Sequence, residues 1–364
     1  MKERVVYIGA ESCVTPLGNT VGTNFQSLLN GVSGIKLQPE VGFQQQAFPL
    51  SAFPTGTYRL PFEELVMESV ANSLAGVDQK IVESERTILL ISSTKGELAL
   101  SVASPFISTV RHLTGKYLLK NEPLVVSSAC ISGVSALNMA SRYLSAGYYD
   151  HAIVVGCDVL SDFVIYGFQS LFALSSECCR PFDKDRAGVN LGEGSAAVVL
   201  SVNKTIFKES SLELLGGAIS NDANHISGPS RTGEGLYRCV KKTLDKHGLN
   251  NDDLGFISAH GTATLYNDEM ESIAFSRLGL AGVPLNSFKG YIGHTLGAAG
   301  IIEVVFSMQS LRSQILIKSL GFDNQGTTGD IRVIKNNTTS HFSVVLKTAS
   351  GFGGCNSSLL LRKI

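Results

Sequence analysis

One stretch of the sequence constrains the fold most strongly: LVVSSACISGVSALNMASRYLSAG, residues 124–147. Its first five residues have the character of a strand, and apolar residues then recur at helical spacing until Gly147. Cys130 therefore lies where a strand turns almost directly into a helix. A thiol there meets the positive end of the helix dipole and unpaired N–H groups, which favour the nucleophilic thiolate. The alternative is a buried, inert cysteine.

The order of strand, loop and helix returns at residues 284–311, and strands alternate with helices along most of the chain. This alternation predicts an α/β fold of parallel sheets covered by helices. The repeat indicates duplication of one α/β unit, with a seam in the polar linker near residues 203–212. We therefore expect an N-terminal half of residues 1–205 and a C-terminal half of residues 206–364. Residues 35–58 are predicted to be an irregular surface loop.

Composition narrows the class of protein. The chain has 364 residues, 44% apolar and 17% charged, which is typical of a compact globule with a large core. Its 30 basic and 31 acidic residues give a net charge of −1 without a basic run, so nucleic acid is not an expected ligand.

The seven cysteines include no CxxC pair, which indicates neither a disulfide framework nor a zinc site. The N-terminus has no signal-peptide layout, and no apolar run reaches the length of a membrane span. These features predict a cytoplasmic, reduced protein.

Two histidines follow predicted strands in loops rich in glycine or threonine. His260 lies in SAHGTATLYND and His294 in KGYIGHTLGAAG. Loops at the carboxyl ends of parallel strands are where open α/β folds place their sites. Each histidine alone could instead be structural, bonded to a backbone carbonyl. With Cys130 in a third such loop, we favour a nucleophile-and-base site, and two histidines indicate more than transfer of one acyl group.

Charged residues flank these loops. Lys289 and Glu303 lie on either side of His294 and could form a pair that orients the histidines or tunes their protonation. The alternative is an ordinary solvated pair. Asp268 and Glu271 begin a predicted helix, where carboxylates are favoured anyway, so we expect a structural role for them.

The glycine turn SGFGGCN offers backbone N–H groups beside Phe352. Together with the N–H of Cys130, such groups could hold an oxyanion. The alternative is a glycine turn with no catalytic role. The chain has no GxSxG, P-loop or HExxH motif.

These motifs together resemble the β-ketoacyl-acyl carrier protein synthases, the condensing enzymes of the thiolase-fold superfamily. The resemblance runs from about residue 4 to 362 and rests on SSACISG, PFDKDRAGVNLGEGSAAVVL, HGTATLYNDEMES, KGYIGHTLGAAGIIE and GFGGCN. It implies two duplicated α/β halves in five layers, αβαβα. It also implies a decarboxylative condensation of a cysteine-bound acyl chain with malonyl-acyl carrier protein, in fatty acid, polyketide or polyene synthesis.

The resemblance also implies roles for individual residues. Cys130 would accept the acyl group, and His260 and His294 would act on the malonyl group. Lys289 and Glu303 would support the histidines. The substrate-binding residues would be Thr262 and Thr264 at the pantetheine arm, Phe352 as the gate of the acyl pocket, and Phe168 as a pocket phenylalanine.

No metal or cofactor is implied. The implied partner is acyl carrier protein in its acyl and malonyl forms, and the implied assembly is a homodimer, with a heterodimer with a second synthase also open.

The chain departs from the family pattern at residues 96–123, which look trimmed where relatives shape the acyl pocket and its cap. The loop KGYIGH is also less usual than the family's Ser-, Met- and Thr-rich version.

Two other functions stay open. One is a thiolase-like acyltransferase that uses coenzyme A. The other is a non-catalytic or chain-length-determining partner in a synthase heterodimer, although the presence of the cysteine and both histidines argues against it.

Overall fold

The computed structural model describes residues 3–59, 61–222, 228 and 230–364. In this part of the chain one mixed sheet of eleven strands runs through the molecule, in the order β12-β10-β9-β14-β15-β8-β1-β7-β6-β4-β5. The strands before residue 206 are β1 (Tyr7–Val14), β4 (Thr87–Ser92), β5 (Leu124–Val126), β6 (His151–Asp158) and β7 (Gly194–Ser201). Those after it are β8 (Leu212–Asn221), β9 (Phe256–Ser258), β10 (Pro284–Asn286), β12 (Arg332–Val333), β14 (Val344–Gly351) and β15 (Cys355–Arg362).

The strand order repeats within this sheet. The order β1-β7-β6-β4-β5 corresponds to β8-β15-β14-β9-β10, and each set has two antiparallel pairings followed by two parallel ones. Antiparallel pairing of β1 with β8 joins the two sets. The repeat supports the proposed duplication, whose boundary at residue 205 stays a prediction.

The sheet is mixed, whereas the alternation of strands and helices predicted parallel sheets. β7 and β15 each run against both of their neighbours. The tight turn between β14 and β15 spans only a few residues, and such a turn joins antiparallel strands, whereas a parallel pair needs a long crossover.

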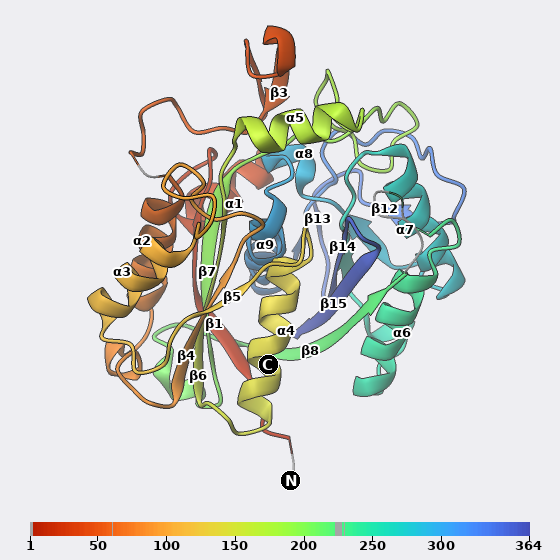
Figure 1. Ribbon diagram of the computed structural model, residues 1–364. Coiled ribbons are helices and arrows are strands. Elements are labelled where there is room, and N and C mark those ends of the chain that lie inside the picture. The colour runs from red at the N-terminus through yellow and green to blue at the C-terminus, as the bar shows by residue number, and fades with distance from the viewer. Residues whose placement is uncertain (1–2, 60, 223–227, 229) are drawn as a thin grey trace.

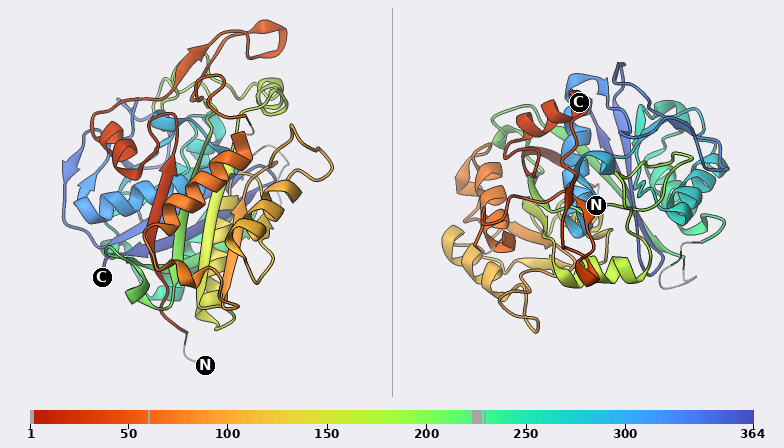
Figure 2. Two further views of the ribbon diagram at one scale, coloured as in Figure 1. Left: turned by 90° about the vertical axis from the view of Figure 1, so that its left-hand side faces the viewer. Right: turned by 90° about the horizontal axis from the view of Figure 1, so that it is seen from above.

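Helices cover both outer faces and fill the space between the two halves of the sheet (Figures 1 and 2). The outer helices are α2 (Pro61–Leu74) and α3 (Ile107–Tyr117) on one side, and α6 (Glu234–His247) and α7 (Leu265–Arg277) on the other. The central pair is α4 (Ser132–Ser145) and α9 (Ala299–Ser313), which contact strands of both halves. The molecule therefore has the five αβαβα layers of the thiolase-like fold.

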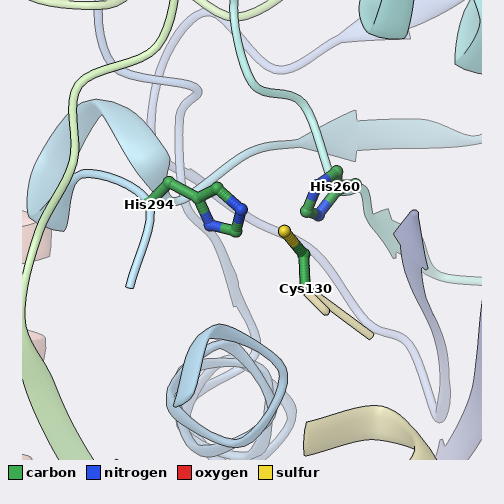
Figure 3. A group of neighbouring side chains, drawn as sticks. All are labelled: Cys130, His260 and His294. Carbon is green, nitrogen blue, oxygen red and sulfur yellow. The ribbon is translucent and has the colours of Figure 1, made fainter. Parts of the chain in front are cut away.

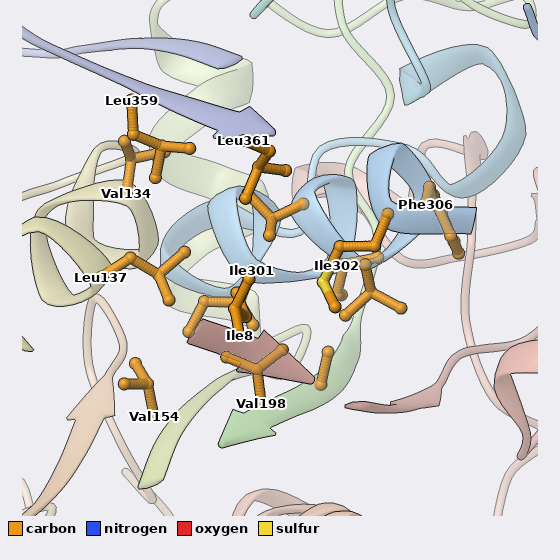
Figure 4. Packing of buried hydrophobic residues seen from close by; sticks show 14 of the residues in the cluster. Ile8, Val134, Leu137, Val154, Val198, Ile301, Ile302, Phe306, Leu359 and Leu361 are labelled. Carbon is orange, nitrogen blue, oxygen red and sulfur yellow. The ribbon is translucent and has the colours of Figure 1, made fainter. Parts of the chain in front are cut away.

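The central layer is the deepest part of the core. Figure 4 shows Val134 and Leu137 of α4 packed near Ile301 and Ile302 of α9 and side chains of both half-sheets. α9 is buried on nearly every face, which explains why its sequence is apolar without a polar stripe. A buried aliphatic side chain contributes about 1.5–3 kcal/mol, so this layer is a main source of stability.

Three shorter helices are α1 (Val21–Leu29), α5 (Asp162–Ser170) and α8 (Lys289–Ile292), of which α5 and α8 lie near the upper end of the sheet in Figure 1. Two small sheets pair β2 (Lys36–Gln38) with β3 (Phe48–Leu50) and β11 (Ile315–Leu316) with β13 (Thr338–Thr339).

The hairpin of β2 and β3 corrects the prediction of an irregular loop at residues 35–58. Phe48 and Leu50 are buried in a small apolar cluster with Leu191, and this contact packs the hairpin against the rest of the molecule. Within the described residues, no helix is long and apolar enough to cross a membrane.

Candidate active site

Cys130 lies in the short loop between β5 and the start of α4, as the sequence predicts. Ser132 holds this loop, because its Oγ accepts a hydrogen bond from the N–H of Ser128 at 2.8 Å and donates one to the carbonyl of Ala129 at 2.6 Å. Ala129 has a φ of +46°, a left-handed conformation that a residue with a side chain rarely adopts. The backbone is thus turned sharply just before the cysteine, a type of strain that collects at functional sites.

Three loops bring Cys130, His260 and His294 together: the first two follow β5 and β9, and the third follows the short helix α8, which comes after β10. The Cys130 Sγ and one ring nitrogen of each histidine lie within 4.8 Å of one another. The two imidazole rings have centroids 5.1 Å apart and stand at 84° to each other, and the cysteine sulfur lies between them (Figure 3). All three side chains are buried.

Burial controls the protonation of the cysteine. It raises the pKa of the Cys130 thiol to about 12; Lys289 acts in the opposite direction, and Cys355 and Asp158 add to the rise. Loss of water around the sulfur therefore favours the thiol in the resting molecule, against the direction expected for a cysteine at a helix N-terminus. The thiol needs a proton acceptor when it attacks.

The two imidazoles are suited to that task. Burial, followed by the charge of Lys289, holds the pKa of His260 and of His294 well below the ordinary value, so both rings are neutral. Neither ring nitrogen of His294 has a hydrogen-bond partner within the part of the chain that the structure describes. A neutral imidazole can accept a proton from a thiol or donate a hydrogen bond to a carbonyl oxygen.

The backbone of His294 is fixed by the segment before β7. Its N–H donates to the carbonyl of Asn190 at 2.7 Å, and its own carbonyl accepts from the N–H of Gly192 at 3.1 Å. The mid-chain motif that contains both residues thus holds the second histidine loop in place.

Lys289 and Glu303 form the ion pair that the sequence predicts. The Lys289 Nζ lies 2.7 Å from Glu303 Oε1, 2.6 Å from the carbonyl oxygen of His260 and 3.3 Å from its Nδ1. Both side chains are at most 1% exposed, so the alternative of a solvated pair is wrong. Burial alone would raise the pKa of Glu303, but two neighbouring ammoniums lower it below its ordinary value and keep the carboxylate charged.

The second of those ammoniums belongs to Lys347 on β14, which lies outside the motifs of the sequence. Its Nζ donates to Glu303 Oε2 and to the carbonyls of Ser258 and Ala259 at 3.2 and 3.3 Å. A lysine directly after the buried run VVL was the available signal, because a lysine in a covered strand must find a partner.

Asp268 and Glu271 hold the first histidine loop from the start of α7, in keeping with the structural role expected for them. Glu271 accepts the N–H of His260 at 2.8 Å and of Gly261 at 2.6 Å, and Asp268 accepts the N–H of Thr262 at 2.9 Å. Burial and the charge of Asp268 raise the pKa of Glu271 to about 7.

A cavity of about 350 Å³ opens from the three catalytic candidates. Its lining includes Thr262, Thr264, Phe168 and Phe352, the residues predicted to bind substrate. The rings of Phe168 and Phe352 have centroids 5.4 Å apart and thus contact each other at this wall. The turn that carries Phe352 also approaches the nucleophile: a Cβ at Gly351 would lie 3.2 Å from the backbone nitrogen of Cys130.

The arrangement has two chemical capacities. A thiol and two neutral imidazoles are ligands that zinc accepts, and this trio could hold a soft metal ion. The same atoms can also take up an acyl group and stabilise the charge that develops on a thioester oxygen.

Comparison with known proteins supports the second capacity. Two models of the beta-ketoacyl synthase family match the chain, the N-terminal domain at residues 78–205 and the C-terminal domain at residues 212–323. Together they cover more than half of it. Fold and site thus define an acyltransferase of the thiolase-like class. The chain belongs to the beta-ketoacyl synthase family.

Relatives agree with this assignment. The chain is 34% identical to 3-oxoacyl-[acyl-carrier-protein] synthase 2 of Rhizobium meliloti, in a match covering 65% of the chain and 60% of that protein. It is 28% identical to 3-oxoacyl-[acyl-carrier-protein] synthase 2 of Coxiella burnetii, over 100% of both proteins. Among solved structures, a ketosynthase of Xenorhabdus doucetiae in complex with its chain length factor is 25% identical, with a TM-score of 0.83, over 99% of this chain and 98% of that one.

Proposed function

We propose that the protein is a 3-oxoacyl-[acyl-carrier-protein] synthase that joins an acyl chain on Cys130 to a malonyl group on acyl carrier protein. The observation that carries the proposal is the convergence of one thiol and two neutral imidazoles within 4.8 Å beside a cavity. The family assignment and the relatives named as 3-oxoacyl-[acyl-carrier-protein] synthases support the same reaction.

In the first half-reaction, Cys130 attacks the thioester of an acyl carrier protein. Its proton passes to a neighbouring imidazole and then to the departing pantetheine thiol. We assign the oxyanion to the backbone N–H groups of Cys130 and Phe352, since the turn carrying Phe352 lies against the nucleophile. A donor of this kind contributes roughly 3 kcal/mol to transition-state stabilisation.

In the second half-reaction, His260 and His294 donate hydrogen bonds to the thioester carbonyl of the malonyl group. The bond to the carboxylate breaks, carbon dioxide leaves, and the electron pair forms an enolate that the two imidazoles stabilise. The enolate carbon attacks the acyl group and displaces Cys130, whose sulfur then takes up a proton. Release of carbon dioxide drives the step, so the proposal requires no metal, nucleotide or redox cofactor.

Other residues support these steps. Lys289 and Glu303 orient His260, because the Lys289 ammonium bonds both its carbonyl and its ring. Thr262 and Thr264 face the cavity where the pantetheine arm would enter.

Phe168 and Phe352 form the aromatic wall at which an acyl chain would begin. Movement of the Phe352 ring would open or close this pocket.

We further propose a dimer. β5 is the last strand of the large sheet, and Leu124 and Val125 on it are partly exposed, which suits pairing with a second chain. A homodimer is the simpler assembly, and the Xenorhabdus ketosynthase in complex with its chain length factor supports a heterodimer as the second possibility. Sedimentation of the purified chain alone would distinguish them: a monomer would contradict the homodimer.

We propose a cytoplasmic location, as the free state of all seven cysteines fits a reducing compartment. One similar protein, from Arabidopsis thaliana, is named as mitochondrial and another as chloroplastic. Fractionation of the source cells would test the location, and recovery in an organelle would contradict it.

Two variants of the nucleophile test the reaction. Cys130→Ala should abolish condensation of acyl and malonyl carrier proteins, because no thioester can form. Cys130→Gln should still decarboxylate malonyl carrier protein, since both imidazoles remain. Condensation by the alanine variant would refute the nucleophile, and loss of decarboxylation in the glutamine variant would contradict the assigned division of labour. A wild-type enzyme that accepts only coenzyme A thioesters would instead favour the thiolase-like reaction.

A further inference from the structure

Lys347 is a completely buried lysine to which neither the sequence motifs nor the proposed reaction gives a role. It lies in β14 and has 0% exposed surface. An ammonium has three N–H groups. Here three oxygen acceptors surround the nitrogen: Glu303 Oε2 and the carbonyls of Ser258 and Ala259.

These contacts join three elements of the site. Ser258 and Ala259 directly precede His260 at the end of β9, and Glu303 lies on α9. The next residue of β14, Thr348, donates from its Oγ1 to Glu271 at 3.5 Å, and Glu271 in turn accepts the N–H of His260. One strand therefore contacts both carboxylates that surround the first histidine loop.

A purely stabilising role explains this lysine poorly. Removing an ion from water costs several kcal/mol, and an apolar residue of similar volume is often as stable or more stable at such a position. Glu303 already has a partner in Lys289, so pairing alone does not call for a second ammonium. The second ammonium leaves the three groups with one excess positive charge close to the imidazoles.

We propose that Lys347 is a positioning residue for His260, which ties the end of β9 to Glu303 and supplies a second positive charge close to the two imidazoles. The inference rests on the proposed condensing function. It assigns to Lys347 two effects that can be measured separately, one geometric and one electrostatic.

The electrostatic effect has a definite sign. The charges of Lys289 and Lys347 act on both imidazoles, and His294 also acts on His260. The thiol of Cys130 lies close to both rings, and Glu271 accepts the backbone N–H of His260. Burial is the main cause of the low pKa of both imidazoles, and the Lys347 charge lowers it further. Removing this charge raises both pKa values. Because the neutral rings are the active form, activity is then lost at a higher pH as the solution is acidified.

The test compares Lys347→Met, which removes charge and hydrogen bonds, with Lys347→Gln, which removes the charge but keeps a donor. Decarboxylation of malonyl carrier protein is measured against pH. We expect the acid limb to move to higher pH in both variants. We expect kcat to fall roughly tenfold to a hundredfold in the methionine variant and less in the glutamine variant, because small misplacements have effects of this size. KM should change little, since Lys347 is buried.

Lys95→Met is the matched control. Lys95 is also a buried lysine paired with a carboxylate, Asp158, at 3.0 Å, but it is not among the charges that act on the imidazoles. It should lower the melting temperature without moving the acid limb. The proposal would be overturned if the acid limb of both Lys347 variants coincided with that of the wild type. It would also be overturned if Lys95→Met shifted the acid limb by the same amount. A wild-type protein that does not decarboxylate malonyl carrier protein would refute the proposed function instead.

Discussion

At the scale of single residues, the site combines a protonated nucleophile with neutral bases. Burial sets both states: it raises the pKa of Cys130 to about 12 and lowers that of His260 and His294. A thiol and an imidazole that are both uncharged can be buried without an unpaired ion. In the proposed reaction, charge develops only when a thioester enters, beside the two imidazoles and the backbone N–H groups that we assign to the oxyanion.

The pH dependence of Cys130 alkylation tests this protonation state. Because thiolate is the reactive form, a pKa near 12 predicts that the rate of modification by iodoacetamide rises through pH 10 without reaching a plateau. Intact-mass kinetics would follow the reaction, with Cys130→Ala subtracted to remove labelling of the other cysteines. A plateau near pH 8 would show instead that the resting enzyme holds a thiolate.

The candidate residues in conspicuous loops could be predicted from the sequence, whereas the contacts of Lys347 could not. Cys130, His260 and His294 each follow a strand in a loop with unusual glycine or threonine content, a local signal. The partners of Lys347 lie 44, 88 and 89 residues away along the chain. Such a contact depends on which strands become neighbours, and no local pattern records that.

At the scale of elements, the crossing of α4 and α9 sets the distance between the two halves of the site. A Cβ at Gly133 would lie 2.9 Å from the nitrogen of Ile301, and one at Gly300 only 2.6 Å from the nitrogen of Val134. The two helices therefore approach closely near their N-terminal ends. The loops that precede them carry Cys130 and His294, so this contact brings nucleophile and imidazole together.

Gly300→Ala should separate these two helix ends. We expect the free energy of unfolding to fall by about 1–3 kcal/mol, as for other overpacked cores. We expect condensation to fall more than tenfold, because a small displacement of the His294 loop is enough. Chemical denaturation and a condensation assay would measure both effects.

Gly115→Ala is the control, since a Cβ at this position of α3 meets nothing within 4 Å. It should leave activity unchanged. Full activity in Gly300→Ala would show that the helix contact does not position the site.

Elements were predictable where the local pattern was simple, as in β4, a largely apolar run of the kind expected for a strand buried on both faces. Strand direction was not, because the antiparallel placement of β7 depends on how a long connection returns to the sheet. The buried hairpin of β2 and β3 was missed for a related reason. Its composition is that of a loop, and burial of Phe48 against Leu191 is a long-range contact.

At the scale of the whole molecule, the duplicated strand order accounts for a site shared between two similar units. The first unit supplies Cys130, and the second supplies both histidines, Lys289 and Glu303. Pairing of β1 with β8 joins the units into one sheet, and α4 and α9 fill the layer between them. Because both units contribute residues, the site spans more than 170 positions in the sequence. It therefore forms only when both halves are folded and packed against each other.

In the proposed reaction this shared site passes an acyl group through Cys130, and intact-mass analysis can follow that transfer. The protein is incubated with an acyl carrier protein that bears an acyl chain, and then with malonyl carrier protein. We predict a mass gain equal to one acyl group, absent in Cys130→Ala and discharged when malonyl carrier protein is added. No mass gain, or a gain that persists in Cys130→Ala, would show that Cys130 does not carry the acyl group.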